Sequence, residues 1–132
     1  EPSGVLMQGE LAKALGVSQI AQQLENTLQR RVLLHAADYA GDNGVASHTV
    51  SKLAWCTGGG QGYIEQAAAA GAQLFISGEV SEQTIHLSRE LGIHFIAAGH
   101  HATERYGVKA LGEFIARQLG LEVQFIDIDN PA

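Results

Sequence analysis

This sequence is poor in cysteine and lacks any long apolar run. Cys56 is the only cysteine among 132 residues, so no disulfide can form within the chain. No apolar stretch approaches the roughly 20 residues that a membrane-spanning helix needs. Residues 1–20 also lack the continuous apolar core of a secretory signal. These absences lead us to expect a cytoplasmic protein that does not enter a membrane.

Positive charge is also scarce. The chain has 14 Asp and Glu residues but only 8 Lys and Arg residues, which gives a formal net charge of −6. Nucleic acids are usually bound by a basic face, so nucleic acid is not an expected partner. We interpret the one local basic cluster, Arg30-Arg31, as a solvated helix end. The length suits one globular domain with a core of its own.

From Ser47 onward, short apolar runs alternate with helical patterns. The runs occupy residues 50–56, 73–77, 93–97 and 122–127, and the helical patterns lie at about 61–70, 81–91 and 101–119. Gly71, Gly92 and Gly120 directly follow the helical patterns, where helix-ending glycines belong. The alternation predicts an α/β fold: an open, largely parallel sheet of about five or six strands with helices on both faces.

The N-terminal part has a less regular pattern. Residues 17–29 are expected to form a helix with Ser18 as its N-cap. Residues 5–11 and 31–36 are predicted strands. Residues 37–48 are rich in turn formers and are predicted to be a loop or hairpin tip.

The start of the last helical pattern carries ionisable side chains. Its apolar positions mark one helix face, expected to be buried: Val108, Leu111, Ile115 and Leu119. Steps of four residues back from Val108 reach Glu104 and then His100, which therefore share that face and can both reach one cation. A structural explanation also exists, because helix dipoles favour Glu104 in the first turn and His100 could be a core imidazole.

Three predicted strands end in small and ionisable residues. These segments are Thr57–Gly60, Ser77–Glu79 and Gly99–Glu104. Because the carboxyl ends of parallel strands meet at one edge of a sheet, we expect the three segments to line one crevice. Two carboxylates and one or two imidazoles there suit a divalent cation such as Mn²⁺, Zn²⁺ or Fe²⁺. His101 points about a quarter-turn away from His100 and is at most a supporting residue.

The glycine run Gly58, Gly59 and Gly60 has two interpretations. It is either a tight connection between strand and helix or a contact for an anion or substrate. It lacks the Gly-Lys-Ser/Thr of a P-loop, and Tyr63 stands where the dinucleotide fingerprint has its third glycine.

Three long motifs, in this order, resemble the YbgI-type branch of the Nif-three-like family, often labelled GTP cyclohydrolase type-two-like. They are LAWCTGGGQ at 53–61, SGEVSEQTIH at 77–86 and AGHHATER at 98–105, followed by FIDI at 125–128. The resemblance implies a toroidal hexamer with a two-metal site at the bottom of a cleft. His100 and Glu104 would bind the metals. We assign Glu79 and Gly58–Gly60 to the cleft wall.

The resemblance covers only the C-terminal half of the family pattern. Family members carry a further His-His pair and an Asp ligand in an N-terminal half that has no counterpart here. Two protein ligands are fewer than the three usual in catalytic sites, so residues 1–132 alone should bind metal weakly and be inactive. We expect a single α/β domain that is half of a longer, two-lobed protein; a start at Glu1 instead of Met is consistent with this.

The leading hypothesis is a metal-dependent hydrolase. Two cations bridged by Glu104 would lower the pKa of a shared water and present it to a nucleotide or other phosphorylated small molecule. The alternative is a non-enzymatic metal-binding assembly protein, in which the cation holds subunits or lobes in register. A nucleotide-binding module that uses the glycine turn alone ranks last, because no matching lysine or ribose-binding acid accompanies it.

Overall fold

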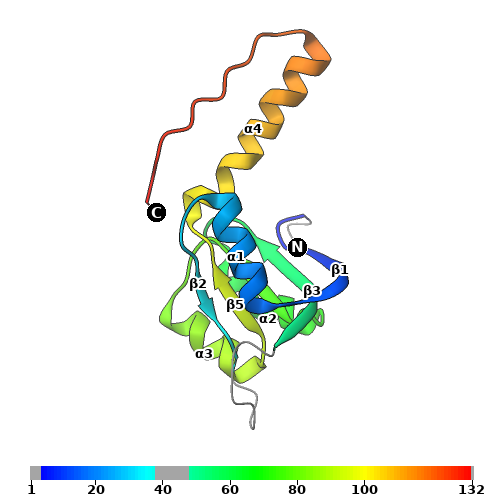
Figure 1. Cartoon of the computed structure of the whole chain (residues 1–132), viewed down its shortest axis with the longest axis vertical. Coiled ribbons are helices and arrows are strands. Elements are labelled where there is room, and N and C mark those ends of the chain that lie inside the picture. The colour runs from blue at the N-terminus through cyan, green and yellow to red at the C-terminus, as the bar shows by residue number, and fades with distance from the viewer. Residues whose placement is uncertain (1–3, 38–47, 132) are drawn as a thin grey trace.

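The computed structural model describes residues 4–37 and 48–131. Figure 1 shows their helices and strands. In chain order these are β1 (Met7–Gly16), α1 (Val17–Leu28), β2 (Leu33–His35), β3 (Thr49–Cys56), the 3₁₀ turn η2 (Gln61–Tyr63), α2 (Ile64–Ala69), β4 (Leu74–Ser77), α3 (Glu82–Leu91), β5 (His94–Ala97) and α4 (His100–Leu119). The expected α/β fold is confirmed. The loop predicted at 37–48 lies mostly outside the described residues.

The sheet has five strands in the order β1-β3-β4-β5-β2. The three central strands are parallel, because β3 pairs with β4 and β4 with β5 in that orientation. Both edge strands are antiparallel to their neighbours. The number of strands agrees with the sequence prediction, but the sheet is mixed and only its centre is parallel.

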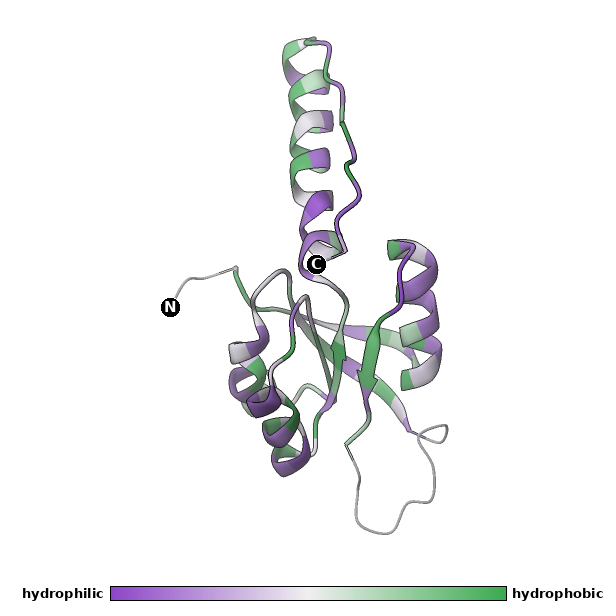
Figure 2. Ribbon diagram, turned by 90° about the vertical axis from the view of Figure 1, so that its left-hand side faces the viewer, coloured by the Kyte–Doolittle hydropathy of each residue, from purple (hydrophilic) through white to green (hydrophobic). Residues whose placement is uncertain are grey.

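Helices cover both faces of the sheet, as expected. Figure 2 shows α1 on one side of the strands and the pair α2 and α3 on the other. Neighbouring residues of β4 point to opposite faces, because Leu74 packs into the cluster under α1 and Phe75 into the cluster under α2 and α3. Both side chains are fully buried. The three central strands are thereby held rigidly between two apolar layers.

The start of α1 differs from its predicted cap. Gly16 is the N-cap, and its N–H donates to the side-chain oxygen of Gln19 at 2.9 Å. Ser18 therefore lies inside the first turn and is not the cap. The sequence could not distinguish these positions, because Ser is a common cap but Gly is also accepted there.

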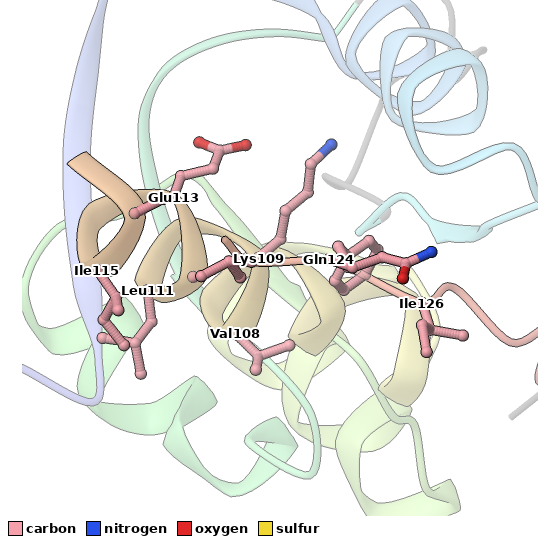
Figure 3. A pocket seen from close by; sticks show the side chains of 11 residues that line it. Val108, Lys109, Leu111, Glu113, Ile115, Gln124 and Ile126 are labelled. Carbon is pink, nitrogen blue, oxygen red and sulfur yellow. The ribbon is translucent and has the colours of Figure 1, made fainter. Parts of the chain in front are cut away.

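The predicted strand at 122–127 is wrong. None of the described residues beyond α4 belongs to a strand; from the far end of α4 they run back beside the helix, outside the sheet (Figures 1 and 2). The chain segment and the helix enclose a groove of about 590 Å³. Figure 3 shows its lining, which includes Val108, Leu111, Ile115 and Ile126.

The apolar face of α4 is exposed, contrary to expectation. Val108 is 63% exposed, Leu111 56% and Leu119 68%. The spacing identified a real apolar face, but the described elements leave most of it uncovered beyond the sheet edge. Within the described ranges, no helix combines the length and apolar character needed to cross a membrane.

Candidate functional site

Three chain segments converge where the central parallel strands end. The β-ladder continues past β4 and β5, because the N–H of Gly99 donates to the carbonyl of Gly78 at 2.9 Å. The hydroxyl of Ser77 donates to the carbonyl of Gly58 at 3.4 Å. The ends of β3, β4 and β5 are therefore joined directly, and the residues that follow them form one corner of the molecule.

His100 lies between two carboxylates at this corner. Its Nδ1 is 2.6 Å from Oε1 of Glu79, and its Nε2 is 3.2 Å from Oε2 of Glu104. The hydrogen bond to Glu79 raises the pKa of His100, with the charge of Glu104 adding to the effect. The same hydrogen bond lowers the pKa of Glu79. The structure thus brings Glu79 of one predicted segment to His100 and Glu104 of another.

Gly58 must be a glycine, both for its backbone conformation and for the side chains that lie against it. Its backbone has a φ of +63°, and a Cβ at this position would collide with the Glu104 carboxylate and lie 3.1 Å from Nε2 of His100. Gly59 lies beside Glu79, since its Cβ would be 3.6 Å from Oε2. Gly60 instead packs against the buried side chain of Cys56. Two of the three predicted glycines therefore border the ionisable group.

Thr103 holds the turn after β3 against α4, a role that no sequence pattern indicated. The Gly58 N–H donates to its hydroxyl at 3.0 Å, and that hydroxyl contacts the carbonyl oxygen of Gly99 at 2.9 Å. One side chain therefore joins the end of β3 to the start of α4. Only the three-dimensional arrangement shows this, because the partners are 45 residues apart.

His101 does not join the group. It lines a separate cavity of about 400 Å³ together with Leu28, Arg105 and the C-terminal segment. Cys56 is buried, and burial followed by the charge of Glu104 raises the pKa of its thiol. A thiol of this kind is a weak nucleophile, which agrees with its expected role as a small core residue.

A pocket of about 520 Å³ borders the corner. Arg30 and Arg31 line it from the segment after α1, and Glu79, Gly99 and His100 line it from the strand ends. Arg30 is half-buried and Arg31 is exposed. The sequence-based interpretation of these arginines as a solvated helix end is therefore incomplete, because both contribute to a concave surface.

The donor atoms at the corner fit part of a metal site. Metal-binding histidines generally donate one ring N–H to a carboxylate, which leaves the other nitrogen to bind the metal. His100 has this arrangement, with Glu79 at Nδ1 and Glu104 one helical turn away on the Nε2 side. Among the residues that the structure describes, no group of three or more His, Cys, Asp or Glu side chains is placed to hold a metal.

Comparison with known proteins gives consistent matches. The model of the Duf34/NIF3 (NGG1p interacting factor 3) family matches residues 2–131. A protein of Yersinia pestis named GTP cyclohydrolase 1 type 2 homolog is 54% identical over 132 residues, all of this chain and 51% of that protein. Its namesake in Haemophilus influenzae is 52% identical over 124 residues, 94% of this chain and 47% of that protein.

A solved structure described as protein ybgI, of unknown function, is similar over 97% of this chain, with a TM-score of 0.86 and 48% identity. The match covers 49% of that chain. The chain described here therefore spans about half the length of the relatives that it matches.

Proposed function

The chain belongs to the Duf34/NIF3 family, in its YbgI-type branch, and from this premise we propose that it is the metal-binding lobe of a divalent-metal-dependent hydrolase. The observation that supports the proposal is the position of His100 between Glu79 and Glu104 at the ends of three parallel strands. The proposed substrate class is a nucleotide or another phosphorylated small molecule, in keeping with the names of the relatives.

Each residue of the corner has a role in this proposal. His100 would bind a cation through Nε2 and Glu104 through its carboxylate. Glu79 would accept a hydrogen bond from Nδ1–H, which leaves the lone pair of Nε2 for the cation. A divalent cation held there, proposed as one of a pair, supplies a coordinated water of lowered pKa for hydrolysis. Gly58 and Thr103 keep the β3 turn against these side chains.

The remaining ligands are proposed to come from a second lobe. Two donor side chains are fewer than the three of most catalytic zinc sites. The relatives are about twice as long as this chain, which leaves room for a second lobe with further ligands. A homo-oligomer, specifically a hexamer, and a cytoplasmic location stay predictions.

The test is turnover of GTP with Mn²⁺ by the protein that contains both lobes. The Glu104→Ala variant should lose all metal-dependent turnover. The matched control is Glu90→Ala, because Glu90 is exposed on α3 and does not line the pocket beside His100. Turnover that survives Glu104→Ala at the wild-type rate would refute the proposed role of the pair.

A second function is supported by the small number of ligands. A cation bound by only two side chains of this chain could instead join two lobes or subunits without catalysis. Light scattering with and without a chelator separates the two functions. Disassembly on metal removal would favour the structural role, whereas an intact assembly that has lost turnover would favour catalysis.

A further inference from the structure

We propose that the pocket beside His100 binds a phosphate group of the substrate, with Arg30 and Arg31 as its cationic side chains. The identification of this phosphate as part of a substrate rests on the proposed function. The anion site itself rests on the arginines and on the start of α4, and it requires no metal.

The pocket places positive charge next to the candidate metal corner. Its wall includes both arginines together with His100 and Glu79. A small molecule whose phosphate lay against the arginines would therefore extend toward the His100–Glu104 pair. The chain as a whole carries a net charge of −6, so this local pair of cations is a specific feature and not part of a broadly basic surface.

Arg30 lies against the backbone of Gly99, the N-cap of α4. A Cβ on Gly99 would collide with the Arg30 guanidinium, so the two groups pack directly together. Gly99 also has a φ of +97°, which favours glycine. The Nε of Arg30 donates to the carbonyl of Arg31 at 3.4 Å, which orients the guanidinium.

The start of α4 adds a second attraction for anions. The first N–H groups of a helix lack intrahelical acceptors, and the helix dipole makes this end positive. Here the guanidinium of Arg30 lies against Gly99 at the start of α4, and Arg30 and Gly99 line the same pocket. Guanidinium groups bind phosphate and carboxylate alike through two parallel hydrogen bonds, so the preference for phosphate rests on its higher charge against two arginines and the helix start.

The negative charge on the wall is partly offset. Oε1 of Glu79 is 2.6 Å from Nδ1 of His100, and Oε2 accepts from the side-chain amide of Gln61 at 3.4 Å. Both carboxylate oxygens therefore have hydrogen-bond partners of their own. Repulsion of a bound phosphate by Glu79 is reduced accordingly.

The experiment is an NMR titration of the chain with inorganic phosphate in the presence of EDTA. The amide resonances of Gly78, Gly99 and His100 report binding in the pocket. We expect saturable shifts there, and an increase of about tenfold in Kd in the Arg31→Gln variant, as expected for loss of a charge-assisted contact. Arg31 is exposed, so this variant should keep the fold. The matched control is Arg89→Gln, an exposed arginine on α3 that does not line the pocket, which should leave Kd unchanged.

Three results would overturn the proposal. They are the absence of saturable shifts at the pocket amides, an unchanged Kd in both Arg31→Gln and Arg30→Lys, and acetate binding as tightly as phosphate. The Glu104→Ala variant keeps the two proposals apart, because it should lose metal binding but still bind phosphate in EDTA. Failure of the metal proposal would therefore leave the anion result standing, and the reverse also holds.

Discussion

The two ends of α4 make opposite kinds of contact. The first two turns are tied to the rest of the fold by Thr103, by the pair of His100 with Glu79, and by Arg105, which donates to the carbonyl of Leu28 at the end of α1 at 3.0 Å. The later turns extend away from the sheet and expose large apolar side chains. One helix thus contains both the candidate site and the least covered surface of the described chain.

The comparison separates two kinds of information in a helical pattern. An apolar period shows which face a helix will bury when something is available to cover it. It does not show what that covering element is. Exposed apolar patches of this kind mark interaction surfaces in many proteins. The later part of α4 is therefore where we expect the proposed second lobe, or another copy of the chain, to have its largest effect.

The largest expected effect is a difference in stability between a variant in the core and one on the exposed part of α4. Phe75→Ala should lower the free energy of unfolding by about 3–5 kcal/mol, because it leaves a cavity between the sheet and its helices. Leu111→Ala should lower it by about 0.5 kcal/mol or less, since Leu111 is 56% exposed. Urea denaturation measures both. A loss at Leu111 as large as that at Phe75 would show that the helix is covered in solution.

A second prediction uses two glycines of this region. Gly99→Ala should destabilise the fold by about 1–3 kcal/mol, because it combines a positive φ with a collision against Arg30. Gly107→Ala should stabilise it by about 0.5–1 kcal/mol, because that position is helical and its Cβ would meet no atom within 4 Å. Thermal unfolding of both variants measures the two changes in stability. Changes of the same sign would contradict the contrast between the start of α4 and its later turns.

The smallest expected effect concerns pH. The raised pKa of His100 gives stability that is present below its ordinary value of 6.5 and lost as pH rises through the raised value. The lowered pKa of Glu79 gives stability that is present above its ordinary value of 4.5 and lost as pH falls through the lowered value. The pair should therefore stabilise most between about pH 4.5 and 6.5. Because both side chains are partly exposed, the change in unfolding free energy should be small.

Histidine NMR checks the cause directly. Glu79→Gln should bring the pKa of His100 down toward its ordinary value, because the first cause of the shift is the hydrogen bond to Glu79. Glu82→Gln is a suitable control, since Glu82 pairs with His86 on the exposed face of α3 and not with His100. An unchanged pKa of His100 in Glu79→Gln would rule out this hydrogen bond in solution.

The sequence predicted the site better than it predicted the C-terminal part. Helical spacing placed His100 and Glu104 together, and the shared carboxyl edge of parallel strands placed Glu79 and Gly58 beside them, because both are general geometric rules that apply to any helix or parallel sheet. The apolar run at 122–127 was predicted as a strand but lies beside α4 outside the sheet. An apolar run indicates a preference for extended structure. Whether it becomes a strand depends on a free sheet edge with which it can pair.

Individual side-chain contacts between distant segments could not be predicted from the sequence either. Thr103 and Arg30 carry no local motif, and their roles depend on contacts with Gly58 and Gly99. Arg30 and Gly99 are joined only when the segment after α1 returns to the edge of β5. Side chains that connect distant segments in this way require the three-dimensional arrangement.

The most direct test of the account is calorimetric titration of Mn²⁺ and Zn²⁺ into this 132-residue chain. The account predicts weak, saturable binding that is lost in Glu104→Ala and kept in Glu113→Ala, because the first carboxylate pairs with His100 and the second lies on the exposed part of α4. Equal heats from the wild-type chain and Glu104→Ala, whether large or absent, would contradict a metal-binding role for the start of α4.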